Sequence, residues 1–172
     1  MRARSVAFCA AMLFVAHGAA LAHVTLEQQE AAPGSTYKAV LRVGHRCEGS
    51  PTTAIRVRIP DGVIAVKPMP KPGWQLETKR EPYAEPVEYY DGTLTEGVRE
   101  IIWSGGNLPD DWYDEFVFRA RLPKGEPGSK LYFATVQECA EGVHRWIEIP
   151  AEGRSADDYE EPAPELTLTP GT

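Results

Sequence analysis

Short stretches in which apolar and polar residues alternate run through most of this sequence. Between Thr36 and Val43, the side chains of Tyr37, Ala39 and Leu41 fall on one side together with Val43. A period of two is typical of a β-strand with one solvent-exposed face. Similar strands are predicted at 53–59, 63–67, 74–78, 87–90, 98–103, 115–121, 131–137 and 143–149.

Glycine and proline clusters separate these stretches, and no amphipathic pattern of helical length is visible. The segment 105–110 is expected to end the strand at 98–103, and the proline-dense segment 68–74 can be neither helix nor central strand. Short strands at intervals of roughly ten residues are typical of an antiparallel β-sandwich. The sequence therefore predicts an all-β fold, an antiparallel β-sandwich in a single domain.

The first 22 residues have the pattern of a signal peptide. Arg2 and Arg4 are followed by a mostly apolar segment at 6–15, and Ala20-Leu21-Ala22 has the small-x-small form that signal peptidase accepts. Cleavage after Ala22 would make His23 the first residue of an exported chain. The predicted location is therefore periplasmic or secreted.

Charge and hydropathy exclude several classes of partner. The full chain has a formal net charge of −7, and removal of Arg2 and Arg4 leaves −9. An acidic chain of this kind is unsuited to binding nucleic acid or an anionic membrane surface. No apolar run of the ~20 residues needed to span a bilayer follows His23, so the mature form is not expected to span a membrane.

The chain is expected to have three parts. Residues 1–22 are the signal peptide, 23–150 the β-sandwich, and 151–172 an acidic, proline-rich tail. The tail is expected to be mobile between 151 and 164, because bulky apolar residues are almost absent there. A short edge strand could form at 166–169.

An N-terminal histidine would offer two nitrogen ligands from one residue. The free α-amine and the imidazole Nδ1 of His23 can close a chelate ring on one metal ion. The α-amine has a pKa of about 7.7–8.0, so a metal ion displaces its proton readily near neutral pH. An exported chain must begin with some residue, however, and a histidine there is not by itself a metal site.

Two cysteines remain after Cys9 is removed with the signal peptide. Cys47 and Cys139 are expected to form a disulfide, as paired cysteines of exported domains usually do, although they could instead be soft ligands for copper. A disulfide would hold the loop of Glu48 beside the acidic loop around Cys139. Glu48 could then serve as a carboxylate ligand, or be an ordinary solvated loop residue.

Motifs of common enzymes are missing from the sequence. No nucleophile motif, phosphate-binding loop or paired-histidine helix motif is present, so an ordinary hydrolase is not expected. Two histidines besides His23 remain in the mature chain, His45 and His144, and either could be a further ligand or an ordinary surface residue. Met69 could supply a thioether but is more simply an exposed or gap-filling residue.

Six motifs stand in order along the mature chain: HVTL at 23–26, SPTTAIRV at 50–57, VKPMPKPGW at 66–74, WSGG at 103–106, YDEF at 113–116 and RWIEIP at 145–150. Together they resemble the YcnI-like copper-binding domain family. The resemblance runs from His23 to about Pro150, which is nearly the whole mature chain.

The resemblance implies a cupredoxin-like or immunoglobulin-like β-sandwich that binds one copper ion, chiefly as Cu(II). The family site is a mono-histidine brace, in which His23 would supply its amine and Nδ1. Glu48 would be the assisting carboxylate and Trp146 the indole close to the metal, with Trp74 and Trp103 as alternatives that are more simply core residues. A cysteine pair is found in one branch of the family.

The function implied is copper trafficking or homeostasis without catalysis. Expected partners are the copper ion and other exported or membrane copper-handling proteins. The alternatives are a copper-dependent oxidase or monooxygenase, which would need His45 or His144 as a second histidine ligand, and a metal-free interaction module.

Overall fold

A computed structural model describes residues 23–44 and 46–170. The predicted signal peptide at 1–22 and the candidate ligand His45 lie outside the described residues. Strands dominate the structure, and the predicted all-β, antiparallel, single-domain fold is confirmed. Within the described ranges, no helix has the length and hydropathy that a membrane span requires.

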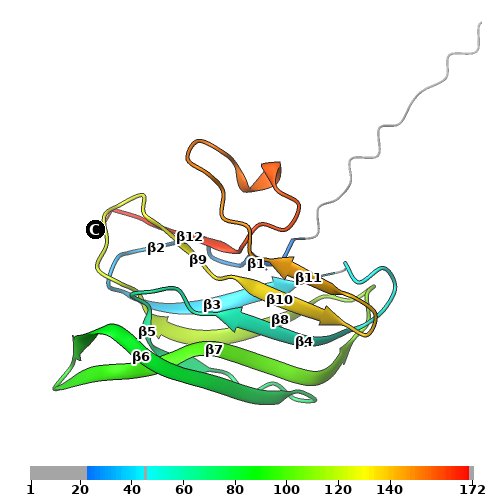
Figure 1. Ribbon diagram of the computed structural model, residues 1–172, viewed down its shortest axis with the longest axis horizontal. Coiled ribbons are helices and arrows are strands. Elements are labelled where there is room, and N and C mark those ends of the chain that lie inside the picture. The colour runs from blue at the N-terminus through cyan, green and yellow to red at the C-terminus, as the bar shows by residue number, and fades with distance from the viewer. Residues whose placement is uncertain (1–22, 45, 171–172) are drawn as a thin grey trace, which may run out of the picture.

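In the part of the chain that the structure describes, twelve strands form three sheets (Figure 1). The four-stranded sheet has the order β1 (Thr25–Leu26), β3 (Thr36–Val43), β8 (Asp114–Arg121) and β5 (Ile64–Pro68). The five-stranded sheet has the order β11 (Val143–Trp146), β10 (Thr135–Cys139), β4 (Thr52–Arg58), β7 (Gly92–Leu108) and β6 (Gln75–Tyr89). The small sheet has the order β2 (Glu30–Ala31), β12 (Glu165–Leu168) and β9 (Lys130–Tyr132), and its β2–β12 pair is parallel.

The two larger sheets contribute to one hydrophobic core. Alternate residues of β3 and β8 point inward, among them Leu41 and Phe116, which are fully buried. Ile55 and Val57 of β4 are also fully buried and belong to the same cluster. The period-two pattern of these strands therefore places their apolar faces against each other, as a β-sandwich requires.

The largest departure from the predicted strands is the long β6–β7 hairpin. The strands expected at 74–78 and 87–90 are parts of one 15-residue strand, β6, which continues through Pro82 and Pro86. Proline is tolerated there because β6 is an edge strand, and the register shifts between Pro82 and Val87.

The predicted strand end at 105–110 is also wrong, because β7 continues to Leu108. Gly105 adopts a φ of 72°, which only glycine accommodates readily. A Cβ atom on Gly106 would lie 2.1 Å from Cε2 of Trp74, so the indole packs directly on this backbone. The two glycines therefore let the strand continue past a bend instead of ending it.

The single strand expected at 131–137 is divided between two sheets. β9 ends at Tyr132 and β10 begins at Thr135, and the fully buried Phe133 lies between them. The strand expected at 143–149 is shorter than predicted, because β11 ends at Trp146. After Trp146, the backbone N–H groups of Ile147 and Glu148 donate hydrogen bonds to the carbonyl of Glu161.

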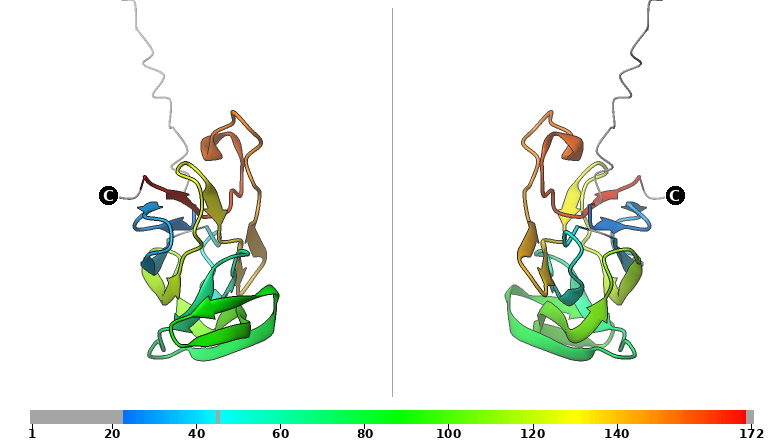
Figure 2. Two further views of the ribbon diagram at one scale, coloured as in Figure 1. Left: turned by 90° about the vertical axis from the view of Figure 1, so that its left-hand side faces the viewer. Right: turned by 90° about the vertical axis from the view of Figure 1, so that its right-hand side faces the viewer.

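Residues 151–170 differ from the expected mobile tail. This segment contains a 3-10 turn at Ala156–Asp158 and the strand β12, which lies between β2 and β9 and not at a sheet edge. Leu166 and Leu168 are at most 1% exposed and belong to the core cluster. Figure 2 shows the segment before β12 on the side of the molecule farthest from the β6–β7 hairpin.

Tyr37 makes the stability of the fold sensitive to alkaline pH. Its side chain is 3% exposed, and its hydroxyl donates a 2.5 Å hydrogen bond to the carbonyl of Gln28. Burial, assisted by the charge of Glu27, raises the pKa of Tyr37 to about 12. Since the pKa is higher in the folded state, this contribution to stability is complete below pH 10 and is lost as the pH rises towards 12.

We expect the free energy of unfolding of the wild type, relative to Tyr37→Phe, to fall by roughly 2 kcal/mol between pH 8 and pH 12. Urea denaturation at intermediate pH values measures this difference. The control is Tyr90→Phe, because the Tyr90 side chain is 83% exposed. A difference between wild type and Tyr37→Phe that does not change with pH would refute the prediction.

Candidate metal centre

His23 and Trp146 meet at one end of the sandwich. His23 lies two residues before β1, and Trp146 is the last residue of β11. Their ring centroids are 5.6 Å apart, and the rings meet edge to face. The structure therefore brings together two of the three residues that the sequence analysis assigned to the site, although 122 positions separate them in the chain.

A chain of buried hydrogen bonds positions the indole. Trp146 is fully buried, and its Nε1 donates a 3.1 Å hydrogen bond to Oε1 of Gln137. The Nε2 of Gln137 donates in turn to the hydroxyl of Thr52 at 2.8 Å. Because all three side chains are at most 2% exposed, the indole is held in one orientation.

The imidazole of His23 is prepared to act as a neutral ligand. Its Nε2 is buried and has no hydrogen-bond partner within the described residues. Burial, together with the positive charge of Arg46, lowers the pKa of His23. The uncharged ring that a metal ion requires is therefore favoured near neutral pH.

Arg46 covers the other side of this aromatic cluster. Its guanidinium carbon lies 5.5 Å from the ring centroid of Trp146. Its Nη2 donates a 3.2 Å hydrogen bond to the carbonyl of Glu160, whereas its Nε is buried without a partner in the described chain. Arg46 therefore places a positive charge beside His23, which opposes protonation of the imidazole and also repels a cation bound there.

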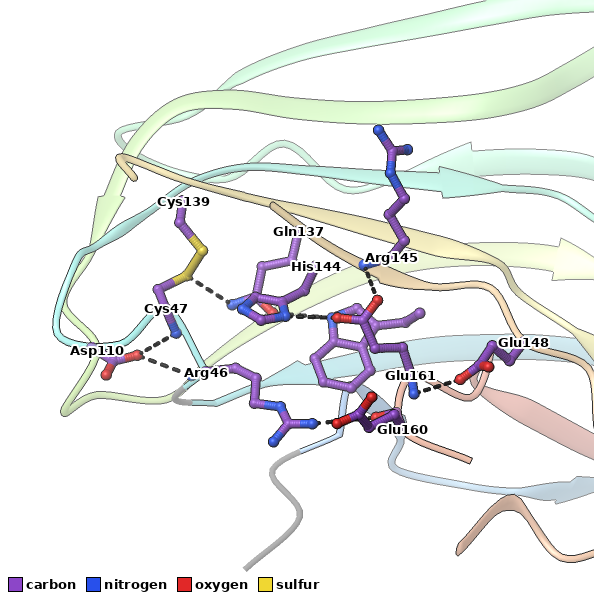
Figure 3. Close-up of polar contacts among 11 residues, drawn as sticks. Arg46, Cys47, Asp110, Gln137, Cys139, His144, Arg145, Glu148, Glu160 and Glu161 are labelled. Atoms are coloured by element: carbon purple, nitrogen blue, oxygen red, sulfur yellow. Dashed lines mark hydrogen bonds and ion pairs between the residues drawn. A yellow bond between two sulfur atoms is a disulfide. The ribbon is translucent and has the colours of Figure 1, made fainter. Parts of the chain in front are cut away.

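The loop that carries Glu48 is held from two directions. The carboxylate of Asp110 accepts backbone hydrogen bonds of 2.9 Å from Arg46, Cys47 and Gly49 (Figure 3). Cys47 is bonded to Cys139, with 5.7 Å between the Cα atoms. The predicted disulfide is confirmed, and the alternative of two soft copper ligands is wrong because both sulfurs are engaged in this bond.

Glu48 lines a hollow of about 420 Å³ at the same end of the molecule. The other lining side chains are polar or charged: Arg46, Asp110, His144, Glu160 and Glu161. Glu48 is exposed and has a φ of 50°, so the loop is tightly turned at this residue. The structure places Glu48 beside Arg46 in the chain, but it shows no contact of Glu48 with His23.

Side chains alone do not assemble a metal site here. Over residues 23–44 and 46–170, no three or more His, Cys, Asp or Glu side chains are grouped so that they could hold a metal ion. A mono-histidine brace needs only one such side chain in addition to His23, because His23 itself would supply two nitrogen ligands, its imidazole and its α-amine.

His144 takes part in the cluster through an ion-pair geometry with Glu161. The Nδ1 of His144 lies 2.7 Å from Oε1 of Glu161, and the imidazole stacks on Trp146 at 5.8 Å. The second carboxylate oxygen of Glu161 accepts a 2.9 Å hydrogen bond from the backbone of Arg145. Glu161 therefore joins its own segment to the His144 side chain and to the backbone of Arg145 in β11 (Figure 3).

The remaining tryptophan alternatives are core residues. Trp103 is fully buried and donates a 3.1 Å hydrogen bond from Nε1 to the carbonyl of Met69. Trp74 packs edge to face on Phe116, with 4.9 Å between ring centroids. The Met69 side chain is 51% exposed, which agrees with its interpretation as a loop residue.

Sequence reasoning missed Arg46, Gln137 and Glu161. No local pattern singles out Gln137, because the inward positions of its strand β10 also include Thr135 and Cys139. Arg46 and Glu161 lie outside the strands. Their roles depend on loops that the tertiary fold brings over Trp146.

Comparison with known proteins places the fold and the family. The chain matches the family model described as a domain of unknown function, DUF1775, over residues 23–168. It is similar to the crystal structure of an uncharacterized protein from Nocardia farcinica, described as having an immunoglobulin-like fold, with 27% sequence identity and a TM-score of 0.64. That similarity covers 86% of this chain and 98% of the other.

No curated protein matches the chain. The family match nevertheless includes β12 and begins at His23, the residue predicted to start the mature protein. Because it covers most of the sequence, the chain belongs to the DUF1775 family, the family of YcnI-like domains.

Proposed function

We propose that this protein is exported and binds one Cu(II) ion through His23 at its mature N-terminus, for copper trafficking or homeostasis. The observation that carries the proposal is the position of His23, whose imidazole packs edge to face against the fully buried indole of Trp146. The family match beginning at this same residue supports it.

The chemistry of the available atoms suits Cu(II). Cleavage after Ala22 frees an α-amine on the residue whose imidazole is kept neutral by burial and by Arg46. Two nitrogens and a carboxylate are ligands that oxidised copper prefers, whereas reduced copper prefers sulfur. Glu48 is the proposed carboxylate, because its loop is held at this end by the Cys47–Cys139 disulfide.

The surrounding residues favour retention over catalysis. The indole of Trp146 shields one side of His23 from water, and Gln137 keeps that indole in place. His144, which a copper oxidase could use as a second histidine, is already paired with Glu161 through Nδ1. We therefore propose a carrier or store for copper rather than an oxidase.

Electron paramagnetic resonance tests the proposed ligands. The mature protein, residues 23–172, is mixed with one equivalent of Cu(II) and compared with a form that carries one extra alanine before His23. We expect a nitrogen-rich tetragonal signal from the mature protein and its loss from the extended form, because the extra residue moves the free amine away from the imidazole.

His144→Gln is the matched control, since it removes an imidazole that also contacts Trp146. Its spectrum should match that of the mature protein. Identical spectra from the mature and extended forms would overturn the proposal, and the metal-free interaction module would become the working hypothesis. Loss of the signal in His144→Gln, or oxygen consumption with a reductant, would favour the copper oxidase.

Arg46→Gln should raise the pKa of His23 and strengthen Cu(II) binding. Removing the positive charge beside the imidazole makes its protonation easier, but it also removes repulsion of the metal ion. We expect the second effect to dominate at pH 7.5, with Cu(II) affinity increasing by roughly threefold to tenfold. Nuclear magnetic resonance titration and competition with a copper chelator measure the two quantities.

Arg145→Gln is the control for the loss of a charge. Figure 3 shows the Arg145 side chain pointing away from the cluster, although its backbone donates to Glu161. It should change neither quantity appreciably. Weaker copper binding by Arg46→Gln would contradict the prediction and would show that the contacts of Arg46 with Trp146 and Glu160 are needed to hold the site together.

A further inference from the structure

A second hollow, of about 620 Å³, lies at the other end of the sandwich. The tip of the β6–β7 hairpin, residues 86–90, lines one side of it, and residues 121–124 at the end of β8 line another. Gly34, Gly62 and Ile64 complete the lining. In Figure 1 the hairpin tip is at the left end of the molecule, whereas the loop that carries Glu48 is at the right end.

The part of this hollow formed by residues 121–124 is preorganised. The backbone of Leu122 donates to the carbonyl of Ser35 at 3.0 Å, and Gly34 donates to the carbonyl of Pro123 at 2.8 Å. Gly62 has a φ of 80°, and a Cβ atom there would lie 2.9 Å from Cβ of Pro123. Close backbone packing and hydrogen bonds therefore fix this surface before any ligand binds.

Apolar and aromatic groups dominate the lining. Val87 and Pro123 present apolar surface, and Tyr89 and Tyr90 pack edge to face with 4.5 Å between ring centroids. Tyr90 is 83% exposed, which leaves a large aromatic side chain in solvent beside the hollow. Mostly apolar concavities with a few polar groups are typical of small-molecule sites.

Two cationic side chains line this apolar hollow and form no ion pair with a described residue. The side chains of Arg121 and Lys124 line the hollow, and neither makes a hydrogen bond or ion pair with any residue the structure describes. The one acidic lining residue, Glu88, accepts a 2.7 Å hydrogen bond from Thr93. In a chain with net charge −7, this leaves a local site suited to an anion.

We propose that this hollow binds a small organic anion with an apolar, preferably aromatic, body and one carboxylate or sulfonate group. The apolar body lies against Val87, Pro123 and the tyrosine pair, and the anionic group lies beside Arg121 and Lys124. This site is separate from the copper site, and its occupation does not depend on His23.

A pair of fluorescent probes tests both parts of the proposal. The probe 8-anilinonaphthalene-1-sulfonate has an aromatic body and one sulfonate, and N-phenyl-1-naphthylamine has the same body without the charge. We expect the sulfonate to bind the mature protein at one site, about tenfold more tightly than the uncharged probe, because each exposed charge contact adds a modest amount.

The double variant Arg121→Gln/Lys124→Gln should remove this tenfold preference and leave binding of the uncharged probe unchanged. The matched control is Lys38→Gln/Arg119→Gln. It removes two cations from the exposed face of the paired strands β3 and β8, outside the hollow. It should bind both probes as the wild type does. Val87→Asp should weaken binding of both probes.

Urea denaturation establishes that each variant is folded, so that probe binding to a disordered state is not mistaken for the site. Nuclear magnetic resonance should show sulfonate-induced shifts at 86–90 and 121–124, and none at Trp146. Equal affinities for the two probes, an equal loss in the control variant, or shifts that avoid the hollow would each overturn the proposal.

Discussion

Replacing Cys47 and Cys139 with serine should lower the free energy of unfolding of the mature protein by about 4–5 kcal/mol. The disulfide joins residues 92 positions apart, so it closes a loop that includes most of the sandwich. In the chain-entropy account, this closure removes many conformations from the unfolded chain, and the effect increases with loop length. The substitution restores those conformations and so favours unfolding.

Urea denaturation of the oxidised wild type and of the double serine variant measures this difference. The reduced wild type is the control, because it keeps both sulfur atoms and loses only the bond. Its stability should be close to that of the variant. A loss below about 1 kcal/mol would contradict the loop-closure account. It would show that other contacts, such as the 2.8 Å hydrogen bond from the backbone of Ala140 to the carbonyl of Pro51, already hold the two loops together.

Trp146→Ala should lower the free energy of unfolding by about 3–5 kcal/mol, because it leaves a cavity where a fully buried indole packs. It also leaves Oε1 of Gln137 without its hydrogen-bond donor in a buried position. The rings of His23 and His144 and the guanidinium of Arg46 lose their shared contact in the same variant.

Trp112→Ala is the matched control, since that indole is 67% exposed. We expect it to change the free energy of unfolding by no more than about 0.5 kcal/mol. Urea denaturation monitored by circular dichroism avoids relying on the fluorescence of the residues that are changed. Similar losses for the two variants would refute the role assigned to Trp146 as a packing residue of the candidate site.

Trp146→Phe separates packing from hydrogen bonding. The smaller ring keeps much of the apolar contact but cannot donate to Gln137. We expect a loss of about 1–3 kcal/mol, the cost of a buried acceptor left unpaired. If Trp146→Phe lowered the free energy of unfolding as much as Trp146→Ala, the hydrogen bonds through Gln137 and Thr52 would contribute more to stability than the packing of the indole.

Local patterns predict most of the sandwich because each strand has one buried face. The alternation at 36–43 and 115–121 identifies β3 and β8 and also their inward residues. The same reasoning fails at β6 and β7, since proline and glycine usually end a strand. Only the position of β6 at a sheet edge, and the packing of Trp74 on Gly106, show why the hairpin continues past them.

The candidate site was likewise predicted only in part from the sequence. The sequence singled out His23 by its place after a signal-peptide pattern, and Trp146 and Glu48 through the family resemblance. The structure adds the contact between His23 and Trp146, the positive charge of Arg46 and the fastening of Glu161. These are contacts between residues far apart in the chain, so no local pattern encodes them.

The sequence by itself determined the fold class and the cysteine pair, because each depends on local periodicity, composition or a short motif. It is also the basis of the prediction that His23 begins an exported chain. Only the tertiary structure decided that β12 is a central strand with Leu166 and Leu168 in the core, and that Arg121 and Lys124 share a hollow with the hairpin tip. Such arrangements follow from how the sheets pack, since packing joins segments whose local sequences carry no information about one another.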